Sequence, residues 1–300
     1  MRVLAVVVTH NRCDLLGRCV DALFAQEKIR PNILVVNNAS TDGTLDMLAS
    51  RNVEVVSQDN VGSAGGWYRG IEIARARGFD AVWLMDDDGF PDTGALHALV
   101  QEMAPDIACA SSVVLCEDRP SRFVFPFPKL DSHGLPRIVG LPRKIARLSE
   151  LESVAVAGKY PFAHFFNGAL ISIWAVEKAG NVDREFFIFG DEVDYFFRLR
   201  KFGRVLSVLR ARHYHPDVSQ RPYTPAKIYY YVRNTLVLNQ RYFNAVWLRN
   251  AMAIVIALGR TARRNGFSEA MSYLVGRNAP VLRRAVASGL QGRLGKDFDV

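Results

Sequence analysis

The sequence predicts an α/β fold, with a mostly parallel sheet covered by helices on both faces, followed by a basic helical region. In the first hundred residues, short β-branched runs alternate with stretches of helical period, which is typical of strands joined by crossover helices. From residue 225 onward the pattern is helical throughout. We therefore expect an α/β domain over residues 1–225 and a helical region over residues 226–300.

The expected elements follow in order along the chain. Four strands are expected, over residues 3–9, 33–36, 53–57 and 81–85. Helices are expected from Asp14, after the turn at residues 40–43, and over residues 65–77, where Gly78 ends the helix. Residues 117–150 hold five of the thirteen prolines, so we expect an irregular loop or lid there.

Composition excludes several classes of protein. The chain has 300 residues, 49% hydrophobic and 23% charged, which rules out wholesale disorder and disulfide-rich miniature domains. The four cysteines match no zinc spacing and are expected to be reduced, in a cytoplasmic protein. The apolar runs at residues 3–8 and 251–258 are too short for a signal-peptide core and a membrane span, respectively.

The positive charge is concentrated in the helical region. The whole chain has a net charge of +8, and residues 226–300 hold twelve basic and three acidic residues. Such a region can bind nucleic acid, an anionic membrane or nothing. Few aromatic residues follow Trp247, which disfavours stacking on single-stranded nucleic acid. We expect no nucleic-acid partner. We expect instead that the protein attaches peripherally to anionic membrane through a basic face formed by Arg260, Arg263, Arg264, Arg283 and Arg284.

Three adjacent carboxylates, Asp86, Asp87 and Asp88, follow the apolar strand at residues 81–85. Because they repel one another, such a cluster indicates a bound cation. A solvated turn that caps a helix is the alternative, although a cap needs only one Asp. With Gly89 the cluster also fits the nucleophile motif of a phosphohydrolase, but those enzymes carry it on the first strand.

A second acidic cluster, residues 190–194, follows the aromatic run at residues 186–189. A carboxylate beside aromatic rings is suited to general-base catalysis, while acidic residues are also favoured at a helix N-terminus. His213 and His215 lie about twenty residues further on, and either could be a structural histidine or a metal ligand.

A glycine-rich loop at residues 60–66 enters a helix, which suits phosphate binding. It lacks the spacing of a dinucleotide-binding loop and does not follow the first strand, which argues against a dehydrogenase. Polar residues 9–12 and 37–40 also follow strands directly. The carboxyl ends of parallel strands meet at one edge, so we expect these clusters to meet there.

Taken in order, these motifs resemble the family 2 glycosyltransferases of GT-A fold, over about residues 3–245. The matching set consists of residues 9–12, 37–44, 60–62, 86–89, 166–169, 190–194, a histidine and residues 229–234. Within the family the chain is most similar to bacterial galactofuranosyltransferases that begin a galactan, and next to rhamnosyltransferases. It departs from many relatives in having Asn37 and Glu192 where they carry Asp.

The resemblance implies an inverting transferase that uses Mn²⁺ or Mg²⁺ and a nucleotide-sugar donor, UDP-galactofuranose or dTDP-rhamnose. The residues implied in donor binding are Thr9, Asn11, Arg12, Asn38, Asn60, Gly65, Gly66, Trp67, Asp86 and Asp87. The implied metal ligands are Asp86, Asp88 and His215.

On the acceptor side, the resemblance implies Glu192 as the catalytic base, with Asp191 beside it. The acceptor, a cell-envelope glycan or a lipid-linked glycan, would contact His164, Asn167, Trp174 and Asp194. Trp67 and Trp174 fit the protein core as well as a sugar platform. A protein that binds a nucleotide sugar without turnover, and a membrane-binding module, remain alternatives, and the oligomeric state stays open.

Overall fold

The structure is a computed structural model that describes residues 1–138, 140 and 142–298. Residues 139 and 141 of the expected loop, and residues 299–300 of the expected basic region, lie outside the described residues. The chain divides into two compact units. Unit 1 contains Met1–Val182 and Tyr195–Asp217, and unit 2 contains Asp183–Asp194 and the chain from Val218 onward.

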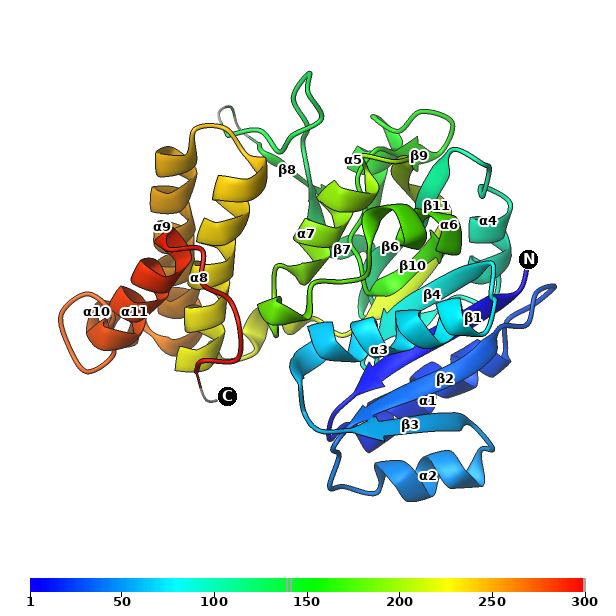
Figure 1. The fold of residues 1–300 in the computed structure, drawn as a ribbon. Helices are drawn as coiled ribbons and strands as arrows, with labels where there is room; N and C mark the ends of the chain where they lie inside the picture. The colour runs from blue at the N-terminus through cyan, green and yellow to red at the C-terminus, as the bar shows by residue number, and fades with distance from the viewer. Residues whose placement is uncertain (139, 141, 299–300) are drawn as a thin grey trace. The chain divides into compact units, whose positions relative to one another are not determined.

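Unit 1 is built around one large sheet with the order β3-β2-β1-β4-β10-β6-β11-β5, and Figure 1 labels these strands except β5. In addition, β7 pairs with β6 and β8, and β9 pairs with β11. The strands are β1 Val3–Thr9, β2 Asn32–Asn38, β3 Glu54–Gln58, β4 Ala81–Asp86, β5 Phe90–Pro91, β6 Ile107–Cys116, β7 Arg119–Pro128, β8 Lys144–Arg147, β9 Lys159–Tyr160, β10 Asn167–Ser172 and β11 Arg204–His215. Its helices are α1 Cys13–Phe24, α2 Thr44–Ser50, α3 Gly62–Ala76, α4 Ala95–Val100, α5 Leu148–Glu152 and α6 Ile173–Ala179.

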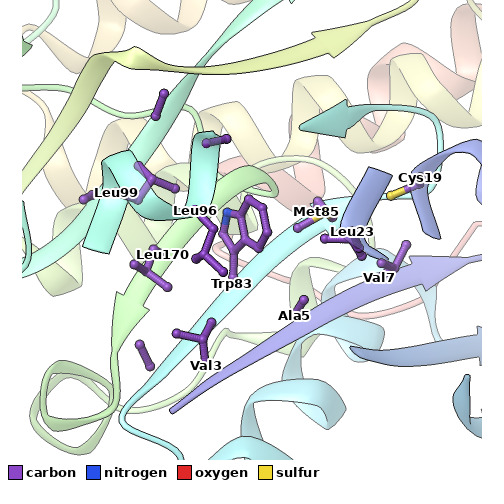
Figure 2. Packing of buried hydrophobic residues seen from close by; sticks show 14 of the residues in the cluster. Val3, Ala5, Val7, Cys19, Leu23, Trp83, Met85, Leu96, Leu99 and Leu170 are labelled. Atoms are coloured by element: carbon purple, nitrogen blue, oxygen red, sulfur yellow. The ribbon is translucent and has the colours of Figure 1, made fainter. Parts of the chain in front are cut away.

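Strand β1 shows why a continuous apolar run forms the centre of this sheet. Its odd-numbered side chains, Val3, Ala5 and Val7, pack against residues of α1 and α4, as Figure 2 shows. Its even-numbered side chains face α3, where a Cβ on Gly66 would lie 2.4 Å from a Val8 methyl. Alternate residues therefore bury both faces of the strand, as the sequence predicts for a parallel sheet between helices.

The strand directions bring distant residues to one edge of the sheet. β1, β2, β3, β4, β6 and β11 are parallel. β10 is antiparallel to β4 and β6. The carboxyl ends of the parallel strands, with Thr9, Asn38, Asp86 and His215, therefore lie along one edge, which we call the carboxyl edge. Asn167, the first residue of β10, pairs with Met85 and so lies at the same edge.

The expectation of an irregular loop over residues 117–150 is wrong. Most of β7, all of β8 and the start of α5 lie in this segment. Phe123 and Phe127 of β7 pack with Ile145 of β8 and Leu151 of α5 in a second core of unit 1. Strand β7 pairs with β8 at few positions and with a register shift, so few backbone N–H groups of β7 are needed for pairing. For this reason the strand tolerates prolines, which lack the N–H group.

Unit 2 is helical, with 3-10 turns at Arg184–Phe186 and Val218–Gln220. Its helices are α8 Pro225–Tyr242, α9 Val246–Asn265, α10 Phe267–Ser272 and α11 Ala279–Leu290, and α7 (Asp191–Leu199) begins in unit 2 and ends in unit 1. Thr224 caps α8, accepting a hydrogen bond from the Lys227 N–H, and Pro225 occupies its first turn. Among the described helices, none is long and apolar enough to cross a bilayer.

Candidate active site

The carboxylates of Asp86, Asp87 and Asp88 gather at the carboxyl edge with few positive charges to offset them. Thr9 Oγ1 donates a hydrogen bond of 2.8 Å to Asp87, and Arg12 Nη1 lies 2.8 Å from both Asp87 Oδ1 and Asp88 Oδ2. Burial, together with the charges of Asp88 and Asp87, raises the pKa of Asp86 to about 8. The raised pKa shows that the cationic side chains nearby do not fully offset the negative charge of Asp86.

His215 reaches Asp88 because two strands meet beside the carboxylates. Strand β11 is long, at 12 residues, and its end pairs with Phe90–Pro91, the short strand β5 just after Gly89. As a result, His215 Nε2 lies 2.8 Å from Asp88 Oδ1, and His215 Nδ1 lies 2.7 Å from the Pro216 carbonyl. Burial alone would lower the pKa of His215, but the hydrogen bond and charge of Asp88 raise it.

His213 occupies a different environment. Its ring is fully buried, and a Cβ on Gly89 would lie 2.3 Å from its Nε2, while one on Gly168 would lie 3.3 Å from its Nδ1. In the described part of the chain, neither ring nitrogen has a hydrogen-bond partner, and burial lowers the pKa of His213 to about 3. The two glycines therefore make room for a neutral ring, and the structure supports His215 rather than His213 as a ligand.

Asn167 extends the site from the antiparallel strand. Its Nδ2 donates a hydrogen bond of 3.3 Å to Asp86 Oδ2, and the Asp86 N–H donates one of 2.7 Å to the Phe166 carbonyl. Phe166 and Gly168 both have positive φ, so the chain bends sharply at Asn167. Asn167 Oδ1 is buried and has no hydrogen-bond partner among the described residues, which fits a contact with a ligand hydroxyl.

The loops that follow β1 and β2 are tied together at this edge. Asn11, with φ of 52°, accepts a hydrogen bond of 2.7 Å from the Thr41 N–H. Asn38 Oδ1 accepts one of 2.7 Å from Gln58, and Asn38 Nδ2 donates one of 3.0 Å to the Gly62 carbonyl. These two predicted donor residues therefore shape the loops that frame the edge.

The glycine loop has a packing role that the sequence did not reveal. Asn60 Oδ1 accepts a hydrogen bond of 3.1 Å from the Gly62 N–H at the start of α3. Gly65 and Gly66 are buried. A Cβ on Gly65 would lie 2.4 Å from the side chain of Val61, just before α3, and a Cβ on Gly66 would lie 2.4 Å from a Val8 methyl of β1. Gly66 therefore lets α3 lie close to the sheet, and a contact of either glycine with the donor stays a prediction.

Neither predicted tryptophan platform is available to a sugar at the carboxyl edge. Trp67 is fully buried and stacks on Phe166, with ring centroids 4.7 Å apart. Trp174 lies at the start of α6, just after the end of β10, and because β10 is antiparallel to β4 and β6 this end lies at the opposite edge of the sheet. A Cβ on Gly203, just before β11, would lie 2.8 Å from the Trp174 ring. Both predictions are wrong, because residue type alone cannot show the burial of a ring or the direction of its strand.

His164 lies in an aromatic cluster that adjoins His215. The rings of Phe127 and Phe162 lie 4.9 and 5.2 Å from the His164 ring, and Phe125 lies 5.8 Å from His164 and 5.6 Å from His215. Burial lowers the pKa of His164 to about 4, so the ring is neutral. The contribution of β7 to this region was missed because residues 117–150 were expected to be irregular.

Glu192 and Asp191 lie in the first turn of α7, within unit 2. Glu192 is partly exposed, and its Oε2 accepts a hydrogen bond of 2.7 Å from the Gly190 N–H. Asp191 is buried. The exposure of Glu192 and the burial of Asp191 favour Glu192 as the residue that meets a solvent-borne acceptor.

Asp194 has a structural role in unit 2. It is buried and accepts hydrogen bonds of 2.6 Å from the Tyr242 hydroxyl and 3.1 Å from Arg241. These contacts fix the start of α7 to the end of α8. The prediction of an acceptor contact for Asp194 is therefore corrected.

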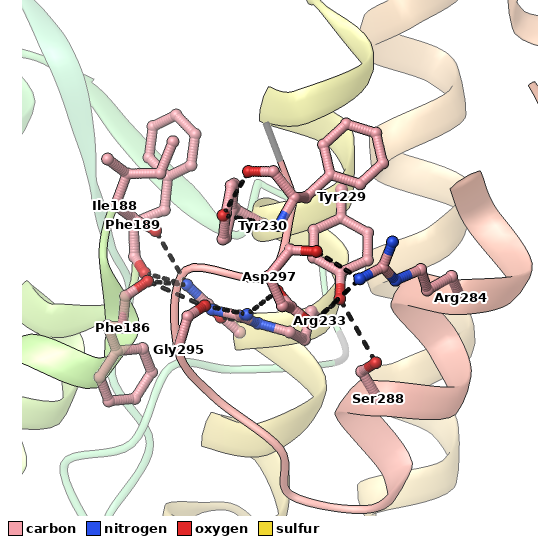
Figure 3. Close-up of polar contacts among 12 residues, drawn as sticks. Phe186, Ile188, Phe189, Tyr229, Tyr230, Arg233, Arg284, Ser288, Gly295 and Asp297 are labelled. Carbon is pink, nitrogen blue, oxygen red and sulfur yellow. Dashed lines mark hydrogen bonds and ion pairs between the residues drawn. The ribbon is translucent and has the colours of Figure 1, made fainter. Parts of the chain in front are cut away.

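The motif at residues 229–234 organises the loop that leads to Glu192, a role that sequence reasoning missed. Asn234 Nδ2 donates hydrogen bonds to the carbonyls of Phe186, Ile188 and Phe189, at 3.1, 2.8 and 2.7 Å. Arg233 is fully buried beside it and binds Asp297 at 2.6 Å, within the network drawn in Figure 3. The backbone carbonyls that Asn234 contacts lie far from it in the sequence, so the motif by itself does not indicate these contacts.

Only part of the predicted metal site is assembled. Within the described residues, no group of three or more His, Cys, Asp or Glu side chains could hold a metal ion. The structure joins two of the three predicted ligands, Asp88 and His215, while Asp86 bonds to Asn167. This pair still fits a divalent cation, because Mg²⁺ and Mn²⁺ sites often use one or two carboxylates and complete their shell with substrate phosphates. The Pro216 carbonyl also orients His215, as is usual for a ligating histidine.

Comparison with known proteins identifies the family. Residues 4–126 match the family model described as glycosyl transferase family 2. Over 222 residues, 71% of this chain and 70% of the relative, it is 33% identical to galactofuranosyltransferase GlfT1 of Mycolicibacterium smegmatis. A GlfT1 of Mycobacterium tuberculosis is 34% identical over 223 residues, with the same shares of the two chains covered. The chain belongs to glycosyl transferase family 2.

Solved structures agree on the fold of this family 2 glycosyltransferase. Residues 1–349 of S. aureus TarS superpose with a TM-score of 0.57 and 15% identity, covering 98% of this chain and 81% of that one. Mannosyltransferase PcManGT of Pyrobaculum calidifontis, in complex with GDP-Man and Mn²⁺, gives a TM-score of 0.55 and 16% identity, covering 96% and 80%. The predicted GT-A α/β fold is therefore confirmed.

Proposed function

We propose that this glycosyltransferase transfers galactofuranose from UDP-galactofuranose to a hydroxyl of a cell-envelope glycan or glycolipid, with inversion at the anomeric carbon. The observation that carries the proposal is the 33–34% identity to two galactofuranosyltransferases over about 70% of either chain. A crystal structure of TarS in complex with UDP, with a TM-score of 0.56, supports a nucleotide site in this fold. The reaction would belong to cell-wall polysaccharide synthesis.

The donor end of the reaction is assigned to the carboxyl edge of unit 1. Asp88 and His215, with Asp86 close to Asp88 in sequence, would hold Mn²⁺ or Mg²⁺, and the ion would neutralise the diphosphate as it leaves. Arg12 holds Asp87 and Asp88 in place, and Thr9 fixes the other oxygen of Asp87. These contacts fix two of the three carboxylates before the donor arrives, which lowers the cost of ordering them on binding.

The acceptor end is assigned to Glu192, which would remove a proton from the acceptor hydroxyl as that oxygen attacks the anomeric carbon. Glu192 already accepts a hydrogen bond from the Gly190 N–H, so its carboxylate is held in a defined position. Asn167 Oδ1 and the neutral His164 ring are the proposed contacts for sugar hydroxyls. Asp191 would help to position the first turn of α7.

The proposed location is the inner face of the cytoplasmic membrane, where a lipid-linked acceptor would be found. The support is the charge of the helical region, which exceeds that of the whole chain. A peripheral attachment by this region would keep the enzyme close to its acceptor.

A panel of nucleotide sugars tests the proposal. Purified protein with Mn²⁺ is incubated with UDP-galactofuranose, UDP-galactopyranose and dTDP-rhamnose, each with a synthetic lipid-linked acceptor, and the products are separated by mass. We expect transfer only from UDP-galactofuranose, with a β-linked product by NMR. Transfer only from dTDP-rhamnose would reassign the enzyme as a rhamnosyltransferase, and tight donor binding without any product would indicate a binding protein.

A further inference from the structure

Helix α9 has two faces that are both apolar, although only one of them is covered. Ala253, Ala257 and Thr261, spaced four residues apart, are buried within unit 2, and Ile254 and Leu258 pack against the same core. Small residues at this spacing let the helix pack closely on its neighbours. This buried face accounts for the position of α9 in the unit.

The opposite face of α9 carries exposed apolar side chains over three turns. Trp247 is 77% exposed, Val255 is 68% exposed and Ile256 is 38% exposed. Ala251 and Gly259 are also exposed. We call these five residues the outer face of α9. A surface helix normally places charged residues opposite its buried stripe, but the five residues of this face are all uncharged.

The exposed apolar surface continues into the next segment of unit 2. Phe267 and Met271 on α10, and Leu274 and Val275 just after it, are exposed. Arg263 lies four residues after Gly259 on the same side of α9 and is exposed. An apolar surface with a positively charged end is typical of helices that lie in the membrane interface.

The five arginines expected to form a basic face are used differently. Arg260 lies 4.9 Å above the Tyr231 ring and Arg264 lies 5.2 Å above the Tyr223 ring. Arg284 donates a hydrogen bond to the Asp297 carbonyl. Three of the five are thus engaged within unit 2. Electrostatic attraction between a basic face and anionic lipid therefore does not fully describe this region. It also does not account for the exposed apolar side chains.

We propose that the outer face of α9 inserts into the headgroup region of an anionic bilayer, with Arg263 near the lipid phosphates. An exposed Trp beside apolar residues suits this depth, because indole is favoured at the interface between hydrocarbon and water. Charge favours lipid over a second copy of the chain, since two helical regions of high positive charge would repel each other while anionic lipid attracts both. The inference refines the membrane location proposed above and does not depend on the identity of the sugar.

Matched pairs of glutamates test the role of the outer face. V255E/I256E places two carboxylates on it, and V154E/V156E places two at exposed apolar positions of unit 1, where Val154 is 49% and Val156 is 79% exposed. Both variants change the net charge equally. Co-sedimentation uses the full chain with vesicles of phosphatidylcholine, with and without 30% phosphatidylglycerol, at low and high salt.

We expect wild type and V154E/V156E to bind the anionic vesicles within about twofold of each other, and V255E/I256E to bind at least about tenfold more weakly. Wild-type binding should partly survive high salt, because apolar insertion is not screened. Tryptophan emission should shift to shorter wavelength on binding, and W247F should abolish most of that shift.

Equal binding by the two glutamate variants, or no wild-type binding to anionic vesicles, would overturn the proposal. A concentration-dependent dimer that V255E/I256E abolishes, with no vesicle binding, would assign the face to a second copy instead. Transfer to a short water-soluble acceptor without vesicles should be the same in all variants. If no sugar is transferred by any of them, the proposed function fails while the vesicle result still decides the docking surface.

Discussion

The two units of the chain each bury charged side chains, and they do so in opposite ways. In unit 2, the buried guanidinium of Arg233 contacts the Asp297 carboxylate, the carbonyls of Gly295 and Phe186, and Asn234 Oδ1. In unit 1, three carboxylates share one arginine and one histidine, and burial leaves Asp86 with a raised pKa. Where the chain supplies all the partners of a buried charge, removing that charge leaves the partners unpaired and is strongly destabilising. A cluster with too few partners indicates that a ligand supplies the rest.

The largest effect that this comparison predicts is on Asp88. Asp88→Asn loses ion pairs with Arg12 and His215 but also relieves the repulsion among three neighbouring carboxylates. We therefore expect transfer to fall by at least about a thousandfold while the free energy of unfolding changes by less than about 1 kcal/mol. Asp46→Asn, at an exposed position on α2, is the control and should leave both quantities unchanged. A strongly destabilised Asp88→Asn would show that this cluster, too, is mainly structural. Initial rates and urea unfolding measure the two effects.

Arg233 should behave in the opposite way. Arg233→Met leaves Asp297 and the loop carbonyls without their donor, so the free energy of unfolding should fall by about 3–5 kcal/mol. Arg263→Met, at an exposed position, should cost less than about 0.5 kcal/mol. A loss below about 1 kcal/mol for Arg233→Met would mean that the network in Figure 3 contributes little to stability.

In the proposed mechanism, Glu192 acts in catalysis and Asp191 in positioning, within one turn of α7. Glu192→Gln keeps the size of the side chain and removes its ability to accept a proton, so transfer should fall by roughly a hundredfold or more, with donor affinity unchanged. Asp191→Asn should retain more activity. Near wild-type transfer by Glu192→Gln together with an inactive Asp191→Asn would exchange the two roles. Single-turnover rates and donor titrations distinguish these outcomes.

His164 gives a smaller effect that depends on pH. Burial lowers its pKa to about 4 in the folded protein, against an ordinary value of 6.5. As the pH falls below 6.5, the unfolded chain takes up a proton that the folded ring does not, so the wild type loses stability. His164→Phe cannot take up this proton. The quantity to compare is the free energy of unfolding of His164→Phe minus that of the wild type, measured by urea unfolding. Between pH 7.5 and pH 5 this difference should shift by about 2 kcal/mol in favour of the variant. If the difference in unfolding free energy does not vary with pH, the pKa of His164 is not lowered by folding and its ring is in contact with water.

Local patterns predicted the sheet and the residues at its carboxyl edge well. The apolar runs at residues 3–9, 33–36 and 81–85 lie in strands, and Thr9, Asn38 and Asp86 are the last residues of these strands. What local patterns could not predict was contact between distant segments. The two-residue strand β5 brings the end of β11 to the carboxylates, and no periodicity can reveal so short a pairing.

The failed predictions have a common physical reason. Trp67 was expected to contact the donor, but its indole is fully buried and stacks on Phe166. Trp174 was assigned without the direction of β10. Burial and strand direction depend on the whole fold, so they are not visible in a motif.

The central claim is that the carboxylates of unit 1 are arranged for a divalent cation that takes part in sugar transfer. The most direct measurement is the initial rate of galactofuranose transfer from UDP-galactofuranose after removal of metal with excess EDTA, followed by titration with Mn²⁺, for the wild type and His215→Ala. We expect no transfer in EDTA, full recovery with Mn²⁺, and a half-saturating Mn²⁺ concentration raised at least about tenfold in His215→Ala. Full turnover of the wild type in excess EDTA would contradict the claim.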